Sequence, residues 1–304
     1  FAGMFALGVA IFSSIPNYVG DLFHFLFGDV LGISVGDLAA LTLLVFGLLL
    51  VTSCGEATKM LKSKDIKEQY DFAERMYESG QFRKANLILT QITPKYIGKP
   101  QGERVMFFLA DSYYQLKDYQ LASYQFERFL KSYPQSEKAE QAAFFGAKSY
   151  YHLSPKYSLD QTDTDNALDK LQVFINMYPE SSYLSEANTL AKELTTKKEQ
   201  KAFEIAKQYN RLGSYNLTVL VSAVKALDNF LMEYPGSVFR EDAWFYKLES
   251  QYTMAINSTP DKIQERLQEA MSSYQSLIKY FPNTKHQEKA EQIVKQIEKQ
   301  QTKP

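Results

Sequence analysis

Few side chains of this sequence have the type and spacing needed for catalysis or for holding a metal. There is one cysteine, Cys54, and the three histidines His24, His152 and His286 lie far apart along the chain. Structural zinc sites and Cys/His nucleophiles need such residues in clusters or at set spacings. Phosphate-binding glycine loops, nucleophile elbows and HExxH motifs do not occur, and the acidic residues are scattered. We therefore expect a protein that is not an enzyme and that has no cofactor and no metal site.

Cys54 follows an apolar run from Leu38 to Val51, which is as long as the core of a signal peptide and too short to span a membrane. Together with the cysteine, the small residues Val51, Thr52 and Ser53 resemble the lipobox of bacterial lipoproteins. The resemblance implies that a signal peptidase recognises these three residues and that Cys54 receives a diacylglyceryl group and acyl chains such as palmitate. The alternative is a buried or membrane-embedded free cysteine, but the chain turns polar directly after Cys54.

Charge is divided unevenly along the 304 residues. Residues 1–58 contain no Lys or Arg and only four acidic residues, so 34 basic and 31 acidic residues remain in 59–304. This balance excludes a strongly basic protein of the nucleic-acid-binding type, and the 45% hydrophobic content excludes a disordered chain. We expect an apolar leader over 1–53, a lipidated tether over 54–65, a polar body over 66–299 and a tail over 300–304.

The first 37 residues have a character of their own. They read FAGMFALGVAIFSSIPNYV and then DLFHFLFGDVLGISVGDL after Gly20, which is similar to a piece of the permease subunits of metal-ion ABC importers. We expect 1–37 to be an upstream or fused fragment. If it is retained, the protein is anchored by a helix instead of a lipid. In either case the body is held at a membrane.

The body contains four copies of one pattern, an aromatic or Leu, then Leu or Ile, two further residues, an aromatic and a proline. Prolines 134, 179, 235 and 282 close the four copies, and Ser or Thr follows two residues later at 136, 181, 237 and 284. Because proline disfavours helical geometry in the residue before it, we expect a helix to end at each aromatic residue and the Ser or Thr to N-cap the next helix.

Alanines recur at fixed distances from these prolines. They stand twelve residues before each proline, at 122, 167, 223 and 270, and eight residues after it, at 142, 187, 243 and 290. Small residues at matching positions allow two helices to cross closely. We therefore predict that these alanines are the helix-crossing positions.

A second internal match relates residues 107–116 to residues 144–153, 37 positions later. With Gly80-x-Phe82-x-x-Ala85 and Asp118-Tyr119-x-x-Ala122, it resembles the turn and second helix of the tetratricopeptide repeat. The fold is therefore predicted to be all-α, a tetratricopeptide superhelix of about five helix-turn-helix units over 66–299 with a capping last helix. Residues 154–166 are expected to form a polar loop, and residues 188–212 a long helix or helix pair.

In this repeat the first helix of each unit lines a concave groove, although most aromatic side chains pack between helices. Helical phase then selects nine candidates for the groove. They are Tyr70, Glu74, Tyr77, Phe107, Asp111, Tyr114, Phe144, Lys148 and Tyr151.

The lipobox, the repeats and the segment Ala206-Lys207-Gln208-Tyr209-Asn210-Arg211-Leu212-Gly213-Ser214-Tyr215 together resemble the tetratricopeptide lipoprotein of the bacterial outer-membrane β-barrel assembly machinery, the BamD family. The resemblance covers residues 51–295. It implies a lipid anchor on the periplasmic face of the outer membrane, binding of the barrel-forming subunit through the C-terminal repeats, and binding of unfolded β-barrel precursors. No nucleic acid is implied. The alternative function is that of another periplasmic tetratricopeptide scaffold, such as a cell-envelope or cell-division coordinator.

Overall fold

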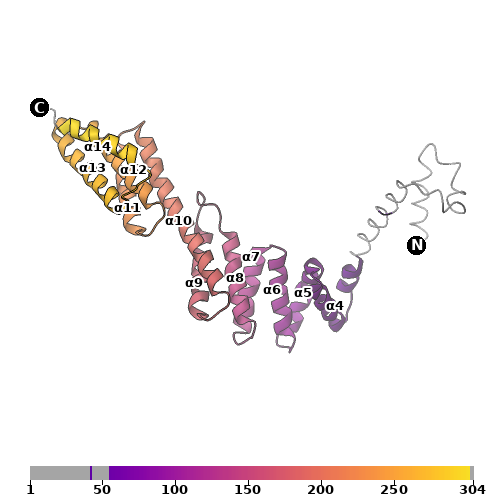
Figure 1. The fold of residues 1–304 in the computed structure, drawn as a ribbon. Helices are drawn as coiled ribbons and strands as arrows, with labels where there is room; N and C mark the ends of the chain where they lie inside the picture. Colours follow the sequence, from indigo (N-terminus) through magenta and orange to yellow (C-terminus); the bar gives the residue numbers. More distant parts are fainter. Residues whose placement is uncertain (1–41, 43–54, 302–304) are drawn as a thin grey trace, which may run out of the picture. The chain divides into compact units, whose positions relative to one another are not determined.

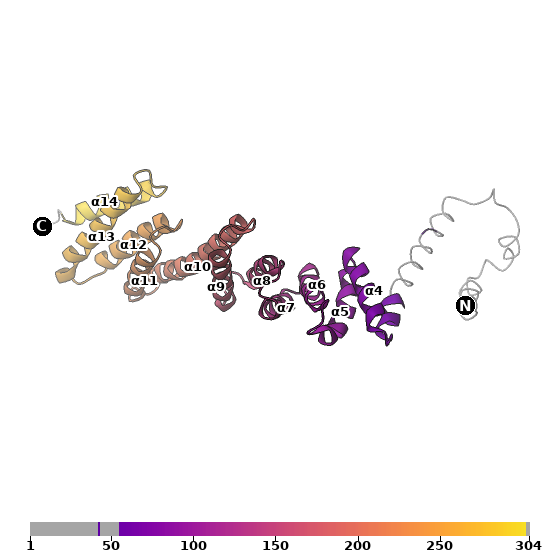
Figure 2. The same cartoon turned by 90° about the horizontal axis from the view of Figure 1, so that it is seen from below.

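The computed structural model describes residue 42 and residues 55–301, and these residues contain helices and no strand. The chain divides into two units, residues 1–69 and residues 70–304. Figures 1 and 2 show the labelled helices from two directions. Their bounds are α4 Ile66–Glu78, α5 Phe82–Tyr96, α6 Gly102–Gln115, α7 Tyr119–Ser132, α8 Ala139–Leu153, α9 Thr162–Met177, α10 Leu184–Gly213, α11 Val219–Glu233, α12 Arg240–Ile256, α13 Pro260–Tyr280 and α14 Gln287–Gln301.

Each of helices α5 to α13 packs against the next helix along the chain. In addition α6 packs against α8, α8 against α10, α10 against α12, and α12 against α14. The even-numbered helices therefore lie side by side in a row, whereas the described odd-numbered helices make no such contacts with one another. This is the arrangement of tetratricopeptide-type helix pairs, in which each unit contacts its neighbours through its first helix. The all-α fold class predicted from the sequence is confirmed.

The aromatic-proline steps end helices as predicted. Tyr133, Tyr178, Tyr234 and Phe281 are the C-cap residues of α7, α9, α11 and α13. Each still donates its backbone N–H to the carbonyl oxygen four residues earlier, at 2.8–2.9 Å. The proline that follows has no N–H to donate and disfavours helical geometry before it, so the helix ends there.

The predicted N-cap role of the Ser and Thr residues is corrected by the structure. Ser136, for example, accepts a hydrogen bond from the Lys138 N–H at 2.9 Å, but α8 begins only at Ala139 and Lys138 is its N-cap. The hydroxyl therefore stabilises a turn that precedes the helix. Ser181, Ser237 and Thr284 accept from the N–H two residues later in the same way.

The eight repeated alanines, Ala122, Ala142, Ala167, Ala187, Ala223, Ala243, Ala270 and Ala290, are fully buried. Seven of them lie in successive apolar clusters, one of which contains Ala122, Phe126, Phe129 and Ala142. A methyl group at these positions leaves space for the large aromatic side chains of the facing helix. The prediction that these alanines are packing positions between helices is confirmed.

Two segments differ in detail from the prediction. The loop expected over 154–166 is shorter, because α9 begins at Thr162. The long helix expected over 188–212 is α10, a continuous helix of 30 residues from Leu184 to Gly213.

In the unit of residues 1–69, residues 55–61 are helical and Asp65 precedes α4. The Asp65 carboxylate accepts from the N–H groups of Lys67 and Glu68, at 2.8 and 3.2 Å. The Gln69 side-chain amide donates to the carbonyl oxygens of Met60 and Ser63. Of the described helices, none is both long and apolar enough to cross a membrane.

Candidate binding face on the first helices

The first helices of successive pairs are joined by contacts between a Ser or Thr hydroxyl and a glutamate. Ser136 Oγ donates to Glu103 at 2.6 Å, Ser181 Oγ to Glu140 at 2.5 Å, and Thr284 Oγ1 to Glu241 at 2.7 Å. Each hydroxyl also accepts from a backbone N–H in its own turn, so it is held in position from both sides. These contacts, which we call latches, fix the start of one first helix against the preceding one.

Tyr77 on α4 is the centre of the first polar cluster. Its hydroxyl donates to Asp111 Oδ2 at 2.5 Å, and Gln115 Nε2 donates to Asp111 Oδ1 at 3.3 Å. The Tyr77 ring stacks on Phe108, with centroids 4.0 Å apart, and meets Phe82 edge-on. Burial and the bond to the carboxylate raise the pKa of Tyr77 well above its ordinary range. The tyrosine is therefore a neutral donor at every physiological pH.

Arg104 on α6 lies beside this cluster. Its guanidinium forms ion pairs with Glu74 at 2.7 Å and with Glu78 at 3.1 Å, and it lies over the Phe108 ring. Tyr70 donates to Glu74 at 3.1 Å. Because Arg104 is half exposed, these ion pairs contribute little to the stability of the fold and mainly orient the side chains.

The second cluster joins α6, α8 and α10. Lys148 on α8 forms an ion pair of 2.6 Å with Glu186 on α10 and lies near the ring of Phe145. Tyr114 packs edge-on against Phe145, with centroids 4.9 Å apart. Burial alone would lower the pKa of Lys148, but the interactions with Glu186 and Tyr114 together outweigh it and the pKa is raised. The pKa of Tyr114 is raised by burial, although Lys148 acts in the opposite direction.

Tyr151, one turn further along α8, donates to Glu193 Oε2 on α10 at 2.5 Å. This hydrogen bond, with burial, raises the pKa of Tyr151 to about 12. His152 is exposed and stacks on Tyr119 at 4.2 Å. Partial burial of its ring, together with the charges of Lys148 and Lys117, lowers its pKa, which favours the neutral imidazole.

Six of the nine residues predicted for the groove are partly exposed on first helices, and three are not. Tyr70, Glu74, Tyr77, Tyr114, Lys148 and Tyr151 belong to the first group. Phe107 is 5% exposed and meets Phe126 and Phe129 edge-on; Phe144 is 1% exposed and packs on Phe174. These two are core residues, so we withdraw them from the proposed face. Asp111 is 6% exposed and lies beneath the proposed face, where it accepts the hydrogen bond that holds Tyr77 in position.

The neighbours of the two buried phenylalanines were not identified from the sequence. Phe108 and Phe145 are partly exposed and carry the ring contacts to Tyr77 and Tyr114. Each Phe-Phe pair offers two rings about 100° apart around the helix, and no pattern in the sequence chooses between them. Arg104, Glu186 and Glu193 were missed as well, because their partners lie on other helices.

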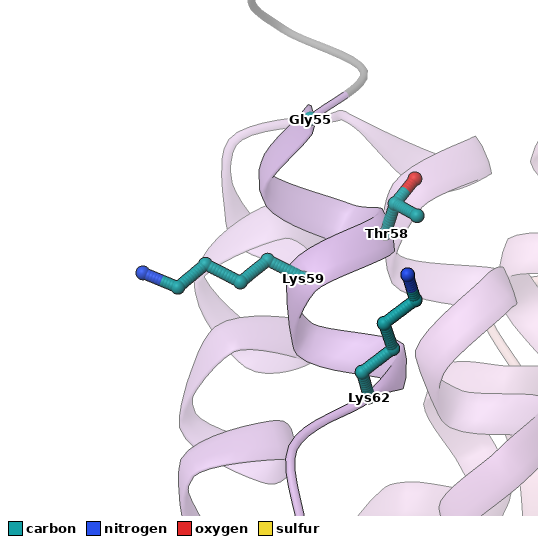
Figure 3. A pocket seen from close by; sticks show the side chains of 4 residues that line it. All are labelled: Gly55, Thr58, Lys59 and Lys62. Carbon is teal, nitrogen blue, oxygen red and sulfur yellow. The ribbon is translucent and has the colours of Figure 1, made fainter.

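The predicted lipid-attachment residue Cys54 and its neighbours Val51, Thr52 and Ser53 lie outside the described residues. Directly after them, Gly55, Thr58, Lys59 and Lys62 border a shallow, open depression. Figure 3 shows Lys62 extending towards Thr58, while Lys59 points away on another side of the helix. Among the described residues, no group of three His, Cys, Asp or Glu side chains is placed to hold a metal ion.

Comparison with family models gives two matches. The YfiO model, described as an outer membrane lipoprotein, matches residues 62–219 and again residues 213–302. The ABC-3 model, described as the ABC 3 transport family, matches residues 1–68, which include the segment 1–37. The two matched regions overlap at residues 62–68. No curated protein matches the chain.

Solved structures with some likeness include two of a Podosopora anserina kinesin light chain with nearly identical TPR-like repeats. One of them is 16% identical over 68% of this chain and 93% of its own, with a TM-score of 0.30. The other structure is 15% identical over 69% and 97%, with a TM-score of 0.29. At these values the likeness adds no argument to the fold described above.

Proposed function

The chain belongs to the YfiO family of outer membrane lipoproteins, and from this premise we propose that it is an assembly factor for outer-membrane proteins. In this proposal the chain is a scaffold on the periplasmic face of the outer membrane. It binds the barrel-forming subunit of the assembly machinery and unfolded β-barrel precursors. It has no catalytic group of its own.

The face of α4, α6 and α8 is the observation that carries the proposal. Tyr77, Tyr114 and Tyr151 lie there on successive first helices, partly exposed, beside ion pairs that include Arg104 and Lys148. Their ring orientations are fixed by stacking or by carboxylate partners. Rigid aromatic side chains interleaved with charges suit an extended polypeptide, because little side-chain entropy is lost on binding.

The C-terminal repeats offer a second surface, at the corner between α10 and α11. Tyr215 is 91% exposed there, and Leu212, Leu217 and Val221 are also exposed. Large apolar side chains that are exposed close together in the chain are typical of protein interaction sites. This surface supports docking of the barrel-forming subunit to this half of the chain.

Cys54 completes the proposal as the lipid attachment site. Lipidation contributes about 0.8 kcal/mol per buried CH₂ group, so two or three acyl chains hold a protein firmly at a membrane. Cells grown with labelled palmitate should label the wild-type chain and not Cys54→Ala, and the variant should leave the outer-membrane fraction. If intact mass shows residues 1–53 still attached in the wild type, the lipid anchor is wrong and a helical anchor replaces it.

The binding face is tested by photo-crosslinking in cells. A photoreactive amino acid replaces Gln115, an exposed residue of α6 next to Asp111, and the matched control replaces Tyr124, an exposed residue of α7. We expect crosslinks to β-barrel precursors from position 115 and few from position 124. Equal crosslinking from both positions contradicts the assignment of the face.

The identity of the larger partner is tested separately. The lipidated chain is purified from outer-membrane extracts and the proteins that co-purify are identified. We expect the barrel-forming subunit to dominate. Recovery of division or peptidoglycan proteins in its place would support the alternative function of a cell-envelope coordinator.

A further inference from the structure

The connection between α8 and α9, residues 154–161, is long for this fold. Eight residues separate these two helices, whereas residues 79–81, 116–118 and 257–259 suffice inside three other pairs. A turn of three residues is therefore enough to connect the two helices of a pair in this fold. Longer ordered loops in compact domains usually have a role of their own.

This loop is held in one conformation by a buried glutamine. Gln161 Nε2 donates to the carbonyl oxygens of Lys156 at 2.9 Å and Leu159 at 3.1 Å, and Thr164 Oγ1 donates to Gln161 Oε1 at 2.7 Å. A side chain that satisfies several loop carbonyls replaces the backbone partners that a helix or strand would supply. The loop is therefore preorganised.

Two lysines of α10 donate hydrogen bonds to the same loop. Lys197 Nζ donates to Ser154 Oγ at 2.7 Å, and Lys201 Nζ donates to the Leu159 carbonyl oxygen at 2.8 Å. Between the loop and α10 there is a depression of about 500 Å³ that is open to solvent. Five of its lining side chains can donate hydrogen bonds into it, namely Lys156, Tyr157, Ser158, Lys197 and Gln200. The Thr196 hydroxyl also lines it but donates to the Lys192 carbonyl oxygen at 2.9 Å.

The positive charge here is not balanced by close carboxylates. Among the described residues, Lys156 and Lys197 have no carboxylate within ion-pair distance, whereas Lys148 on α8 and Lys198 on α10 are each paired with one at 2.6 Å. Burial holds the pKa of Lys197 below its ordinary value, although Glu193 acts in the opposite direction. A bound anion would relieve the cost of leaving the partly buried Lys197 without a carboxylate partner.

Glu193 is the one carboxylate that lines the depression. One of its oxygens already accepts the 2.5 Å hydrogen bond from Tyr151, which draws its charge towards α8. In the lining, two lysines, Lys156 and Lys197, face this one carboxylate. Lys201 lies outside the lining and interacts with Asp160, a carboxylate of the loop itself. The presence of Glu193 restricts where an anion can lie and leaves the net charge of the site positive.

We propose that the depression between loop 154–161 and α10 is a binding site for an oxyanion, a phosphate or carboxylate group. Lys156 and Lys197 supply the charge, and the hydroxyls of Tyr157 and Ser158 supply neutral donors. The site adjoins the proposed binding face through the Tyr151–Glu193 contact, but it does not depend on the proposed function.

The test is calorimetric titration of the full chain in detergent micelles with two probes, inorganic pyrophosphate and citrate. We expect saturable binding that weakens as salt is added. Lys156→Gln and Lys197→Gln should each raise the Kd about tenfold, the effect of losing one charge-assisted hydrogen bond. The matched control is Lys225→Gln, an exposed lysine of α11, which should leave the Kd unchanged.

The two probes distinguish the sources of the anion. Preference for pyrophosphate identifies a phosphate site, and preference for citrate identifies a carboxylate site. The proposal is overturned if neither probe binds, or if Lys225→Gln weakens binding as much as Lys156→Gln. Lys156 is exposed and its side chain makes no described hydrogen bond, so its replacement does not endanger folding.

Gln161→Ala tests the role of the loop, because Gln161 holds the loop without lining the depression. We expect weaker binding with the helical content unchanged by circular dichroism. If Gln161→Ala keeps full affinity, the loop does not position the site and that part of the proposal is wrong.

Discussion

The Tyr77 hydroxyl and the Asp111 carboxylate, 2.5 Å apart, join the first helices of two successive pairs. Tyr77 also stacks on Phe108, so the residue combines a partly exposed ring with contacts that hold two helices together. Helical phase alone placed Tyr77 in a groove, where truncation would affect binding alone. The structure shows that its truncation removes packing as well.

Tyr77→Phe should therefore destabilise the chain, because it keeps the ring and leaves one oxygen of the buried Asp111 without its donor. The expected loss is about 1–3 kcal/mol in the free energy of unfolding, measured by urea denaturation. Tyr215→Phe is the control, since Tyr215 is almost fully exposed. A loss of equal size in both variants would mean that the Asp111 contact contributes nothing to stability.

The features of this fold that could be predicted from the sequence are those set by residues close together in the chain. The aromatic-proline steps and the alanines recur with fixed spacing, so the helix ends after Tyr133 and Tyr178 and the buried positions at Ala122 and Ala142 were predicted correctly. Each of these features depends on residues within one repeat. Local patterns of this kind survive in any unit that has the same fold.

The binding face was harder to predict, because it depends on contacts between helices. Phe107 and Phe108 are adjacent in sequence, and only the packing of α7 decides that Phe107 faces the core. The partner of Ser136 is Glu103, 33 residues away, so a hydroxyl that looked like a helix cap is also an inter-repeat donor. Neither the burial of Phe107 nor the partner of Ser136 can be predicted from the residues next to it in the sequence.

The latches should each contribute measurably to stability. Ser136→Ala and Ser181→Ala should each lower the free energy of unfolding by about 1–2 kcal/mol, because the turn loses its side-chain acceptor and the glutamate loses a donor. Ser237→Ala is the matched control: Ser237 accepts from the Phe239 N–H, and no hydrogen bond from its hydroxyl to a glutamate accompanies this contact in the described residues. Its effect should be clearly smaller. Three equal losses would show that the turn matters and the glutamate does not.

The attachment of α14 to α12 should depend on pH. Asp242 contacts Lys285 at 2.9 Å and His286 at 2.6 Å, and His286 stacks on Phe245. Burial alone would raise the pKa of Asp242, but the bonds to Lys285 and His286 outweigh it and hold the pKa below the ordinary 3.8. A lowered pKa in the folded state means that the contribution is complete above pH 3.8 and is lost as the pH falls below it.

Asp242→Asn should accordingly lower the melting temperature at pH 7, by an amount equivalent to about 1 kcal/mol, since Lys285 is largely exposed. The difference between the wild type and the variant should shrink as the pH is lowered below 4, roughly the ordinary pKa of the carboxyl group. Melting curves of both proteins from pH 7 to pH 3 provide the measurement. A difference that is constant over this range would show that the charge of Asp242 does not stabilise the folded state.

The alanines of the C-terminal repeats connect stability to the proposed docking surface. Ala223 and Ala270 are fully buried, so Ala223→Leu or Ala270→Leu should overpack the helix pairs at a cost of about 1–3 kcal/mol. Ser222→Leu, the exposed neighbour on α11, is the control and should change stability little. If the C-terminal repeats bind the barrel-forming subunit, Ala223→Leu should reduce its co-purification while crosslinking of precursors from position 115 persists. Loss of both interactions together would mean that the helix array unfolds as one cooperative body. The two surfaces would then be tested separately with Tyr215→Ala, which removes an exposed ring and leaves the core intact.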